Sequence, residues 1–340
     1  MSEPPRRRPP LFSIVIPTYN RSASVRTAIR SALAQTETDF ELFIVDDGST
    51  DDTAARLGRF QGDARVHVLV NQKNRGQHAC RNQAIREAQG EWICFLDSDD
   101  LFLPLRLERL REAIEKRPET GFWFTNAYLH RYGRIIGLLF DPKRDIPEGV
   151  VPGHYAVGDA FLPYVTTMVA VRRGAFLKTG FFREDLKILE DTELYARMLK
   201  DGLPVGVLRE PLAVRFIHES QITRDHERDF SESMVALKSS GARPDVQAKA
   251  RERIALEVAG YLWKALKPAQ SRELLILIQG RRAKGTWAYW RTFLPIAPLG
   301  WAKSLRTWFL RTRYHPAFVP EAWRQAGRAV DDLAAATSSE

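Results

Sequence analysis

The stretch Trp92-Ile93-Cys94-Phe95-Leu96-Asp97-Ser98-Asp99-Asp100 has the pattern of a buried strand followed by acidic residues. It joins an apolar run, Trp92 to Leu96, directly to a cluster of three carboxylates. A short apolar run bounded by turn residues is typical of a strand buried on both faces of a sheet. In an open parallel sheet, ligands bind beyond the carboxyl ends of the strands. Aspartates there repel one another unless a cation or ligand offsets their charge. The stretch therefore indicates either a metal–diphosphate site or a solvated acidic turn that begins the next helix.

The sequence before this stretch alternates between strand and helix patterns. Strands are expected at residues 12–16, 42–45 and 66–70, and helices at residues 22–35, from 53 onward, at 79–88 and at 105–114. This alternation predicts right-handed βαβ units and a mostly parallel sheet with helices on both faces. After Gly121 the rhythm changes, with strands expected at 122–128, 167–171, 205–208 and 213–217, and a helix at 192–200.

Composition limits the class of protein. The chain has 340 residues, 44% hydrophobic and 27% charged, which is typical of a globular protein of about two domains. We expect a disordered leader at residues 1–10, an α/β domain at 11–225, and a helical, basic and aromatic region at 226–340. No apolar window is long enough for a transmembrane helix. The two cysteines, Cys80 and Cys94, lack metal-binding spacing and indicate a reduced, cytoplasmic compartment.

The net charge of +9 favours acidic partners such as nucleotides, anionic lipid headgroups or nucleic acid. Polar residues follow three predicted strands: Pro17-Thr18-Tyr19-Asn20, Asp46-Asp47-Gly48-Ser49 and Asp97-Ser98-Asp99. Adjacent parallel strands would bring these ends to one edge, where amides, hydroxyls and carboxylates suit a nucleotide. The first strand end lacks the glycine fingerprint of a dinucleotide site, so a dehydrogenase is disfavoured.

The chain resembles family 2 glycosyltransferases, which are inverting enzymes with the A-type nucleotide-sugar fold. The resemblance covers about residues 10–225. It is carried by Val15-Ile16-Pro17-Thr18-Tyr19-Asn20, Val45-Asp46-Asp47-Gly48-Ser49-Thr50-Asp51, Asn74-Arg75-Gly76 with Arg81-Asn82, Phe95-Leu96-Asp97-Ser98-Asp99-Asp100, Gly180-Phe181-Phe182, and Glu190-Asp191 leading into Leu194-Tyr195-Ala196-Arg197. It implies a Rossmann-like, mostly parallel sheet with flanking helices, and it identifies residues 11–225 as the catalytic domain.

The resemblance also implies a donor site. Asp99 would hold Mn²⁺ or Mg²⁺, Asp97 would lie near the ribose, and Asp47 would contact the base. The implied donor-binding residues are Pro17, Thr18, Tyr19, Asn20, Asp46, Asp47, Lys73, Arg81, Asp97 and Ser98. From the residues alone, the Asp46-Asp47-Gly48 segment fits a simple turn better than a ligand contact, because Asp-Gly is a strong turn dipeptide. Lys73 and Arg81 equally fit a solvated helix face.

Catalytic and acceptor residues are implied farther along the chain. Asp191 would be the base that takes the proton of the acceptor hydroxyl, and Glu190 would orient it or bind the acceptor. By themselves, two carboxylates at a helix start also favour the helix dipole. His218 is expected as a further ligand of the metal or diphosphate, with a structural role as the alternative. Residues Thr166, Thr167 and Met168 are expected to line the acceptor side.

Residues 281–313 combine eight arginines and lysines with many aromatics and contain no Asp or Glu. Trp301, Leu305, Trp308 and Phe309 follow helical spacing. Basic, Trp-rich amphipathic helices bind the interface of anionic membranes. The alternative is a helical subdomain that packs these aromatics against the catalytic domain. Nucleic acid is not expected, because no RNA- or DNA-binding motif accompanies the basic residues.

These features predict a metal-dependent, inverting glycosyltransferase of the hexosyltransferase type. It would move a sugar from a nucleotide-diphosphate donor to a glycan or lipid-linked acceptor during synthesis of a cell-surface polysaccharide. We expect it in the cytoplasm, peripherally bound at the inner face of the cell membrane. The alternative is a non-catalytic, membrane-associated protein that binds nucleotide sugars or glycans. The presence of both Asp99 and Asp191 favours the enzyme.

Overall fold

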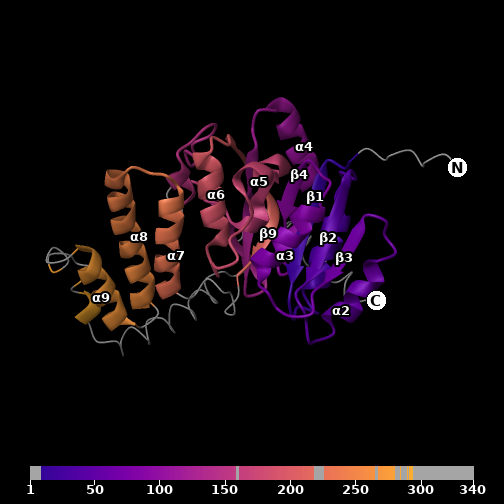
Figure 1. Cartoon of the computed structure of the whole chain (residues 1–340). Helices are drawn as coiled ribbons and strands as arrows, with labels where there is room; N and C mark the ends of the chain where they lie inside the picture. Colours follow the sequence, from indigo (N-terminus) through magenta and orange to yellow (C-terminus); the bar gives the residue numbers. More distant parts are fainter. Residues whose placement is uncertain are drawn as a thin grey trace, which may run out of the picture.

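The computed structural model describes residues 9–157, 161–217, 226–264, 267–279, 284, 289 and 291–293. A mixed sheet carries helices on both faces (Figure 1). Its strands are β1 (Phe12–Thr18), β2 (Phe40–Asp46), β3 (Val66–Val70), β4 (Trp92–Phe95), β5 (Leu101–Phe102), β6 (Phe122–Arg131), β7 (Arg134–Leu138), β8 (Val169–Arg172) and β9 (Val205–Phe216). The α-helices are α1 (Val25–Leu33), α2 (Thr53–Leu57), α3 (Gln77–Glu87), α4 (Arg106–Lys116), α5 (Arg173–Thr179), α6 (Glu190–Lys200), α7 (His226–Ser239), α8 (Pro244–Lys264) and α9 (Pro268–Gln279). Short 3₁₀ turns are η1 (Gly58–Phe60), η2 (Gly153–Ala156), η3 (Thr166–Met168) and η6 (Arg291–Phe293).

The strand order is β3-β2-β1-β4-β8-β6-β9-β5, with β7 paired to β6. The first four strands of this order are mutually parallel. The second half is mixed: β6 and β9 are parallel, whereas β8 is antiparallel to both β4 and β6. The predicted mostly parallel sheet is therefore confirmed. Because β1 lies between β2 and β4, the carboxyl ends of these three strands meet at one edge, as expected.

Two apolar clusters fill the two faces of the sheet. Successive side chains of a strand point to opposite faces, and β1 follows this rule. Val15 belongs to the cluster covered by α3 and α6, whereas Ile14 and Ile16 belong to the cluster covered by α1 and α4. Cys80 and Cys94 are both buried in these clusters, one on each face, and both are free thiols that pack as small apolar groups.

One prediction about the strands is wrong. Residues 205–208 and 213–217 were expected to form two short strands, but β9 is a single strand of 12 residues. The polar sequence around Glu210 interrupts the apolar pattern without ending the strand. Instead, the pairing of β9 with β6 shifts register on either side of Asn126. The buried Asn126 amide donates to the carbonyls of Phe140 and Arg209, which holds the irregular segment together.

The C-terminal helices α7, α8 and α9 stand side by side on the side of the molecule opposite β3 (Figure 1). Helix α7 packs against α6, and α8 packs against α7. Apolar residues of α7 and α8 belong to the same cluster as α3 and α6, among them Ala236, Leu237, Ile254, Val258 and Leu262. None of the helices within the described ranges has the length and hydropathy needed to cross a membrane.

Candidate active site

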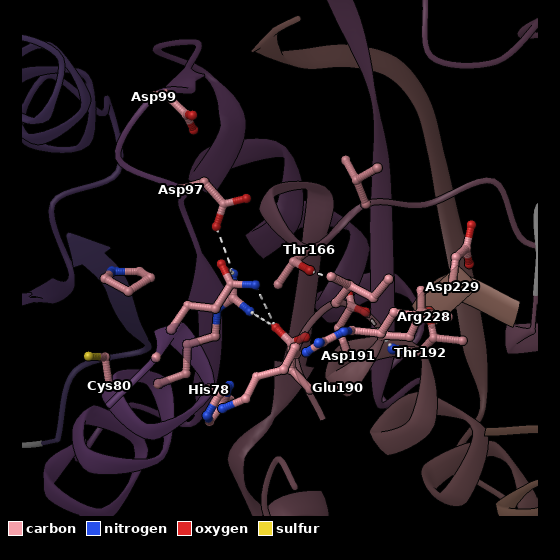
Figure 2. A pocket seen from close by; sticks show the side chains of 18 of the residues that line it. His78, Cys80, Asp97, Asp99, Thr166, Glu190, Asp191, Thr192, Arg228 and Asp229 are labelled. Atoms are coloured by element: carbon pink, nitrogen blue, oxygen red, sulfur yellow. Dashed lines mark hydrogen bonds and ion pairs between the residues drawn. The ribbon is translucent and has the colours of Figure 1, made fainter. Parts of the chain in front are cut away.

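A cavity of about 970 Å³ opens at the carboxyl ends of β1, β2 and β4. It extends from these strand ends to the start of α6 and to helices α7 and α8. The structure brings eleven of the predicted site residues to its walls: Pro17, Thr18, Tyr19, Asp47, Arg81, Asp97, Ser98, Asp99, Thr166, Glu190 and Asp191. In Figure 2, Asp97 and Asp99 lie on one side of Thr166, and Asp191 lies on the other.

Three predicted donor contacts do not line this cavity. Asp46 is fully buried, and its carboxylate accepts hydrogen bonds from the amide and hydroxyl of Ser49. The side-chain carbonyl of Asn20 accepts from the backbone amide of Thr50 at 2.8 Å. The backbone of Lys73 packs under Gly48, where a Cβ atom would lie 2.9 Å from it. In this structure, Asp46 and Asn20 therefore stabilise the loop after β2.

Two predicted acceptor residues also lie behind the cavity wall. Thr167 is fully buried, and its hydroxyl accepts a hydrogen bond from the amide of Asp97 at 3.1 Å. Met168 is fully buried in the apolar cluster that α1 and α4 cover. His218 and most of residues 281–313, including Trp301 and Trp308, lie outside the described residues. The predicted leader at 1–10 is described only at residues 9 and 10.

Asp47 organises the loop that leads into α3. One carboxylate oxygen accepts from the amides of Arg75 at 2.9 Å and Gly76 at 2.7 Å. The other accepts from the side-chain amide of Asn71 at 3.1 Å. Gly76 has φ +96°, a conformation that L side chains rarely adopt, and a Cβ there would meet the ring of His78. The glycine thus lets the loop close around Asp47.

Arg81 connects Asp97, at the end of β4, to Glu190, at the start of α6. Its guanidinium donates to Asp97 at 2.7 Å and to Glu190 at 2.9 Å, and its side chain is only 1% exposed. Gln77 also donates to Glu190, at 2.8 Å. Figure 2 shows these contacts as a chain of dashed lines between Asp97 and Glu190. The alternative that Arg81 lies on a solvated helix face is therefore wrong. Its position on the buried side of α3 was not evident from charge alone.

Burial sets the protonation of this network. Burial, and secondarily the neighbouring Asp191, raise the pKa of Glu190 to about 7, although Arg81 acts in the opposite direction. Burial also disfavours the charge of Arg81, but Asp97 and Glu190 together raise the pKa of Arg81 above its ordinary value. The carboxyl group of Glu190 therefore changes charge near neutral pH, whereas Arg81 stays cationic.

The other carboxylates of the strand end differ in their surroundings. Asp99 is partly exposed, and one of its oxygens lies 3.6 Å from the guanidinium of Arg21. Asp100 is buried and accepts a hydrogen bond from the amide of Phe216 at 2.9 Å. Burial raises the pKa of Asp100 well above its usual range, and the charges of Asp97 and Asp99 add to this effect. Asp100 thus ties β9 to the carboxylate cluster.

Asp191 is held at the start of α6. One carboxylate oxygen accepts from the hydroxyl of Thr166, and the other accepts from the amide of Thr192 at 2.6 Å. Asp191 remains partly exposed to the cavity. Both contacts orient the carboxylate without neutralising its charge. This arrangement suits a group that takes a proton from a bound hydroxyl.

Several cavity residues were not predicted. Arg75 lies within a quoted motif, and Arg21 and Gln77 adjoin quoted motifs, so their positions in the sequence were a usable signal. Helices α7 and α8 contribute a larger group from a region where we found no motif: Arg228, Asp229, Ser233, Ile254, Glu257, Val258 and Tyr261. Figure 2 shows Arg228 and Asp229 on the Asp191 side of the cavity.

The raised pKa of Glu190 predicts a pH-dependent stability. The folded protein binds this proton more tightly than the unfolded chain, so the free energy of unfolding falls as pH rises from about 4.5 to about 7. Glu190→Gln removes the titrating group. The stability of this variant relative to wild type should therefore rise across that window, by up to ~3 kcal/mol.

Urea unfolding at pH 4.5, 6 and 8 measures the difference in stability between Glu190→Gln and wild type. Glu252→Gln, at an exposed glutamate of α8, should follow wild type. Parallel curves for wild type and Glu190→Gln would contradict the shift.

Comparison with known proteins shows which family the chain belongs to. Residues 13–134 match the model of glycosyl transferase family 2. The putative teichuronic acid biosynthesis glycosyltransferase TuaG of Bacillus subtilis is 38% identical over 205 residues, which cover 60% of this chain and 78% of TuaG. The Escherichia coli UDP-Glc:alpha-D-GlcNAc-diphosphoundecaprenol beta-1,3-glucosyltransferase WfgD is 32% identical over 134 residues, 39% of this chain and 52% of WfgD. For several relatives, including WfgD, the match covers less than two thirds of their length.

The solved mannosyltransferase PcManGT from Pyrobaculum calidifontis, in complex with GDP-Man and Mn²⁺, has a similar fold. The TM-score is 0.57 at 17% identity, over 97% of this chain and 87% of that one. The fold is therefore that of the A-type glycosyltransferases. The chain belongs to glycosyl transferase family 2, which confirms the resemblance seen in the sequence, and it is a glycosyltransferase.

Proposed function

We propose that the protein is a metal-dependent, inverting glycosyltransferase of polysaccharide biosynthesis. It transfers a sugar from a nucleoside diphosphate donor to a glycan or lipid-linked acceptor. The observation that carries this proposal is that two pairs of carboxylate residues line one cavity and that an arginine connects the two pairs. Asp97 and Asp99 lie at the strand ends, Glu190 and Asp191 lie at the start of α6, and Arg81 bridges Asp97 and Glu190. The names of the relatives TuaG and WfgD support glycan synthesis.

The strand ends offer a binding surface for the nucleotide. Thr18 lines the cavity, and its buried hydroxyl has no hydrogen-bond partner among the described residues, so a ligand can satisfy it. Tyr19 is 42% exposed and presents a ring on which a base can stack. Asp47 retains acceptor capacity beyond its three loop contacts. These groups support a nucleoside at the ends of β1 and β2.

The carboxylates at the end of β4 fit a divalent cation that is held partly by substrate. Within the described part of the chain, no three His, Cys, Asp or Glu side chains form a group able to hold a metal. Mg²⁺ and Mn²⁺ sites commonly use one or two carboxylates and complete their shell with phosphate oxygens. We assign Asp99 as the ligand, because Asp97 is already paired with the buried Arg81. A bound cation would stabilise negative charge on the departing diphosphate.

Asp191 supports a single displacement. A base that deprotonates the acceptor hydroxyl must face the sugar from the side opposite the diphosphate. Asp191 lies across the cavity from Asp99, and Thr166 and Thr192 fix its orientation. The acceptor would then lie between Thr166 and the α7–α8 wall, which presents Arg228, Ser233 and Tyr261. Peripheral membrane contact through residues 281–313 stays a prediction from composition.

A donor screen tests this function. Purified protein is incubated with UDP-, GDP- and dTDP-sugars in Mn²⁺, and thermal shift identifies the nucleotide that binds. Release of the nucleoside diphosphate is then followed with and without EDTA, and proton NMR gives the anomeric configuration of the product. We expect metal-dependent release and a β-linked product from an α-linked donor.

Two outcomes would contradict the proposal. A product with retained configuration would exclude a single displacement by Asp191. Tight nucleotide binding without release from any donor, with glycan or lipid-linked acceptors present, would favour the non-catalytic binding protein. The exposed Asp52→Asn variant serves as the matched control, since Asp52 makes no side-chain capping bond at α2. Its activity should equal that of wild type.

A further inference from the structure

The segment that enters α6, residues 187–189, is held by a side chain from α7. We call it the entry turn. Glu232 of α7 directs its carboxylate at this turn, where one oxygen accepts from the amides of Lys187, Ile188 and Leu189 at 2.9–3.1 Å. The other oxygen accepts a second contact from the Lys187 amide at 2.9 Å. Glu190 and Asp191 follow immediately.

The residue at the N-cap of α6 makes no capping hydrogen bond with its own side chain. Leu189 is the residue that precedes α6, and an apolar side chain cannot accept a hydrogen bond from a backbone amide. Glu232 is only 7% exposed, so the three amides replace the water that its carboxylate loses on burial. A negative charge at this position also complements the positive end of the α6 dipole. The contact therefore stabilises both partners.

Helix α7 is itself firmly placed against α6. Ala236 and Leu237 are buried in the apolar cluster that includes Leu194 of α6. The hydroxyl of Ser239 donates to the carboxylate of Glu193 at 2.7 Å. On the same helix, Ser233 lines the cavity. The Glu232 contact thus fixes the backbone that precedes Asp191 relative to a helix that is itself packed against α6.

We propose that Glu232 is a positioning residue that sets the location of Asp191 through the backbone of the entry turn. This inference rests on the proposed role of Asp191 as the base. Without the Glu232 carboxylate, three buried or partly buried amides lose their acceptor, and the entry turn relaxes. Asp191 then leaves the geometry needed for proton transfer. A displacement of about 1 Å can cost ~10²-fold in rate. The nucleotide site at β1, β2 and β4 is not touched by this contact.

The test compares Glu232→Ala and Glu232→Gln with wild type in the full chain. We expect Glu232→Ala to lower kcat ~10²-fold, while KM for the donor and the affinity for UDP or GDP with Mn²⁺ stay nearly unchanged. Glu232→Gln keeps one acceptor oxygen but places an NH₂ group against the amide of Lys187, so kcat should fall ~10-fold. Hydrogen exchange at residues 187–189 should accelerate in both variants.

Ser239→Ala is the matched control, because it removes a side-chain contact between α7 and α6 that does not reach the entry turn. It should retain wild-type kcat. Wild-type kcat in a folded Glu232→Gln protein overturns the proposal even where Glu232→Ala does not fold. Equal loss of kcat and nucleotide affinity in Glu232→Ala also overturns it, since that pattern reports general disruption. Asp191→Asn in the same assay separates the two hypotheses: full activity there refutes the base assignment itself.

Discussion

Asp191→Asn is expected to lower turnover by ~10²–10⁴-fold while the affinity for the nucleotide sugar stays nearly normal. Asparagine has the shape of aspartate, and its carbonyl can still accept from the Thr192 amide or the Thr166 hydroxyl. It cannot take a proton from the acceptor. Because the base acts on the acceptor and not on the diphosphate, ground-state donor binding does not depend on it. Calorimetric titration of the donor and single-turnover transfer measure the two effects separately.

The same experiment distinguishes loss of chemistry from loss of structure. The thermal midpoint of Asp191→Asn should match that of wild type closely, since the asparagine carbonyl can accept from the Thr192 amide while its NH₂ group donates to the Thr166 hydroxyl oxygen. Asp52→Asn, the exposed control, should bind and transfer normally. A normal transfer rate in Asp191→Asn would remove this residue from the mechanism. Weakened donor binding equal to the loss in rate would instead place Asp191 in the donor site.

Asp99→Asn is expected to have the second large effect, on metal-dependent binding. An amide is a weaker ligand than a carboxylate for a hard divalent cation, so Mn²⁺ should no longer increase the affinity for UDP or GDP. Several kilocalories per mole of charge stabilisation would be lost from the transition state, which corresponds to at least ~10²-fold in turnover. Titration of the nucleotide with and without Mn²⁺ gives the first effect, and product release gives the second.

The surroundings of Asp99 make this test specific. Its ion pair with Arg21 is partly exposed and contributes little to stability, so Asp99→Asn should fold normally. Arg21→Gln removes the same ion pair but leaves the carboxylate. It should therefore keep the Mn²⁺ dependence that Asp99→Asn loses. Unchanged Mn²⁺ dependence in Asp99→Asn would show that another group binds the metal.

The nucleotide half of the site could be predicted because local rules determine it. The apolar runs of β1, β2 and β4 can be buried only in the centre of a sheet, and parallel order brings their polar ends to one edge. The sequence did not predict which individual side chains reach the cavity. Asp46 is the last residue of β2 and Asp47 follows it, and only Asp47 reaches the cavity. Which of two adjacent aspartates faces a ligand depends on a register that composition does not reveal.

The other half of the site depends on tertiary packing. Residues of α7 and α8 line the cavity because these helices dock beside α6, and no motif in residues 226–264 indicates that contact. Glu232 illustrates the limit: in the sequence it is one acidic residue of an amphipathic helix. The backbone amides that donate to it lie more than forty positions earlier in the chain, so their proximity follows only from the folded structure.

The shared core of α7, α8 and the sheet has a consequence for how the enzyme can diversify. The wall that faces the proposed base is part of the folding unit and is not a module attached to it. Exchanging α7 and α8 would expose the apolar face of α6 and disturb the entry turn. Under the proposed function, new acceptor preferences can arise by substitutions at cavity positions such as Arg228, Ser233 or Tyr261. Those side chains can vary while the buried face that carries Ala236 and Leu262 stays fixed.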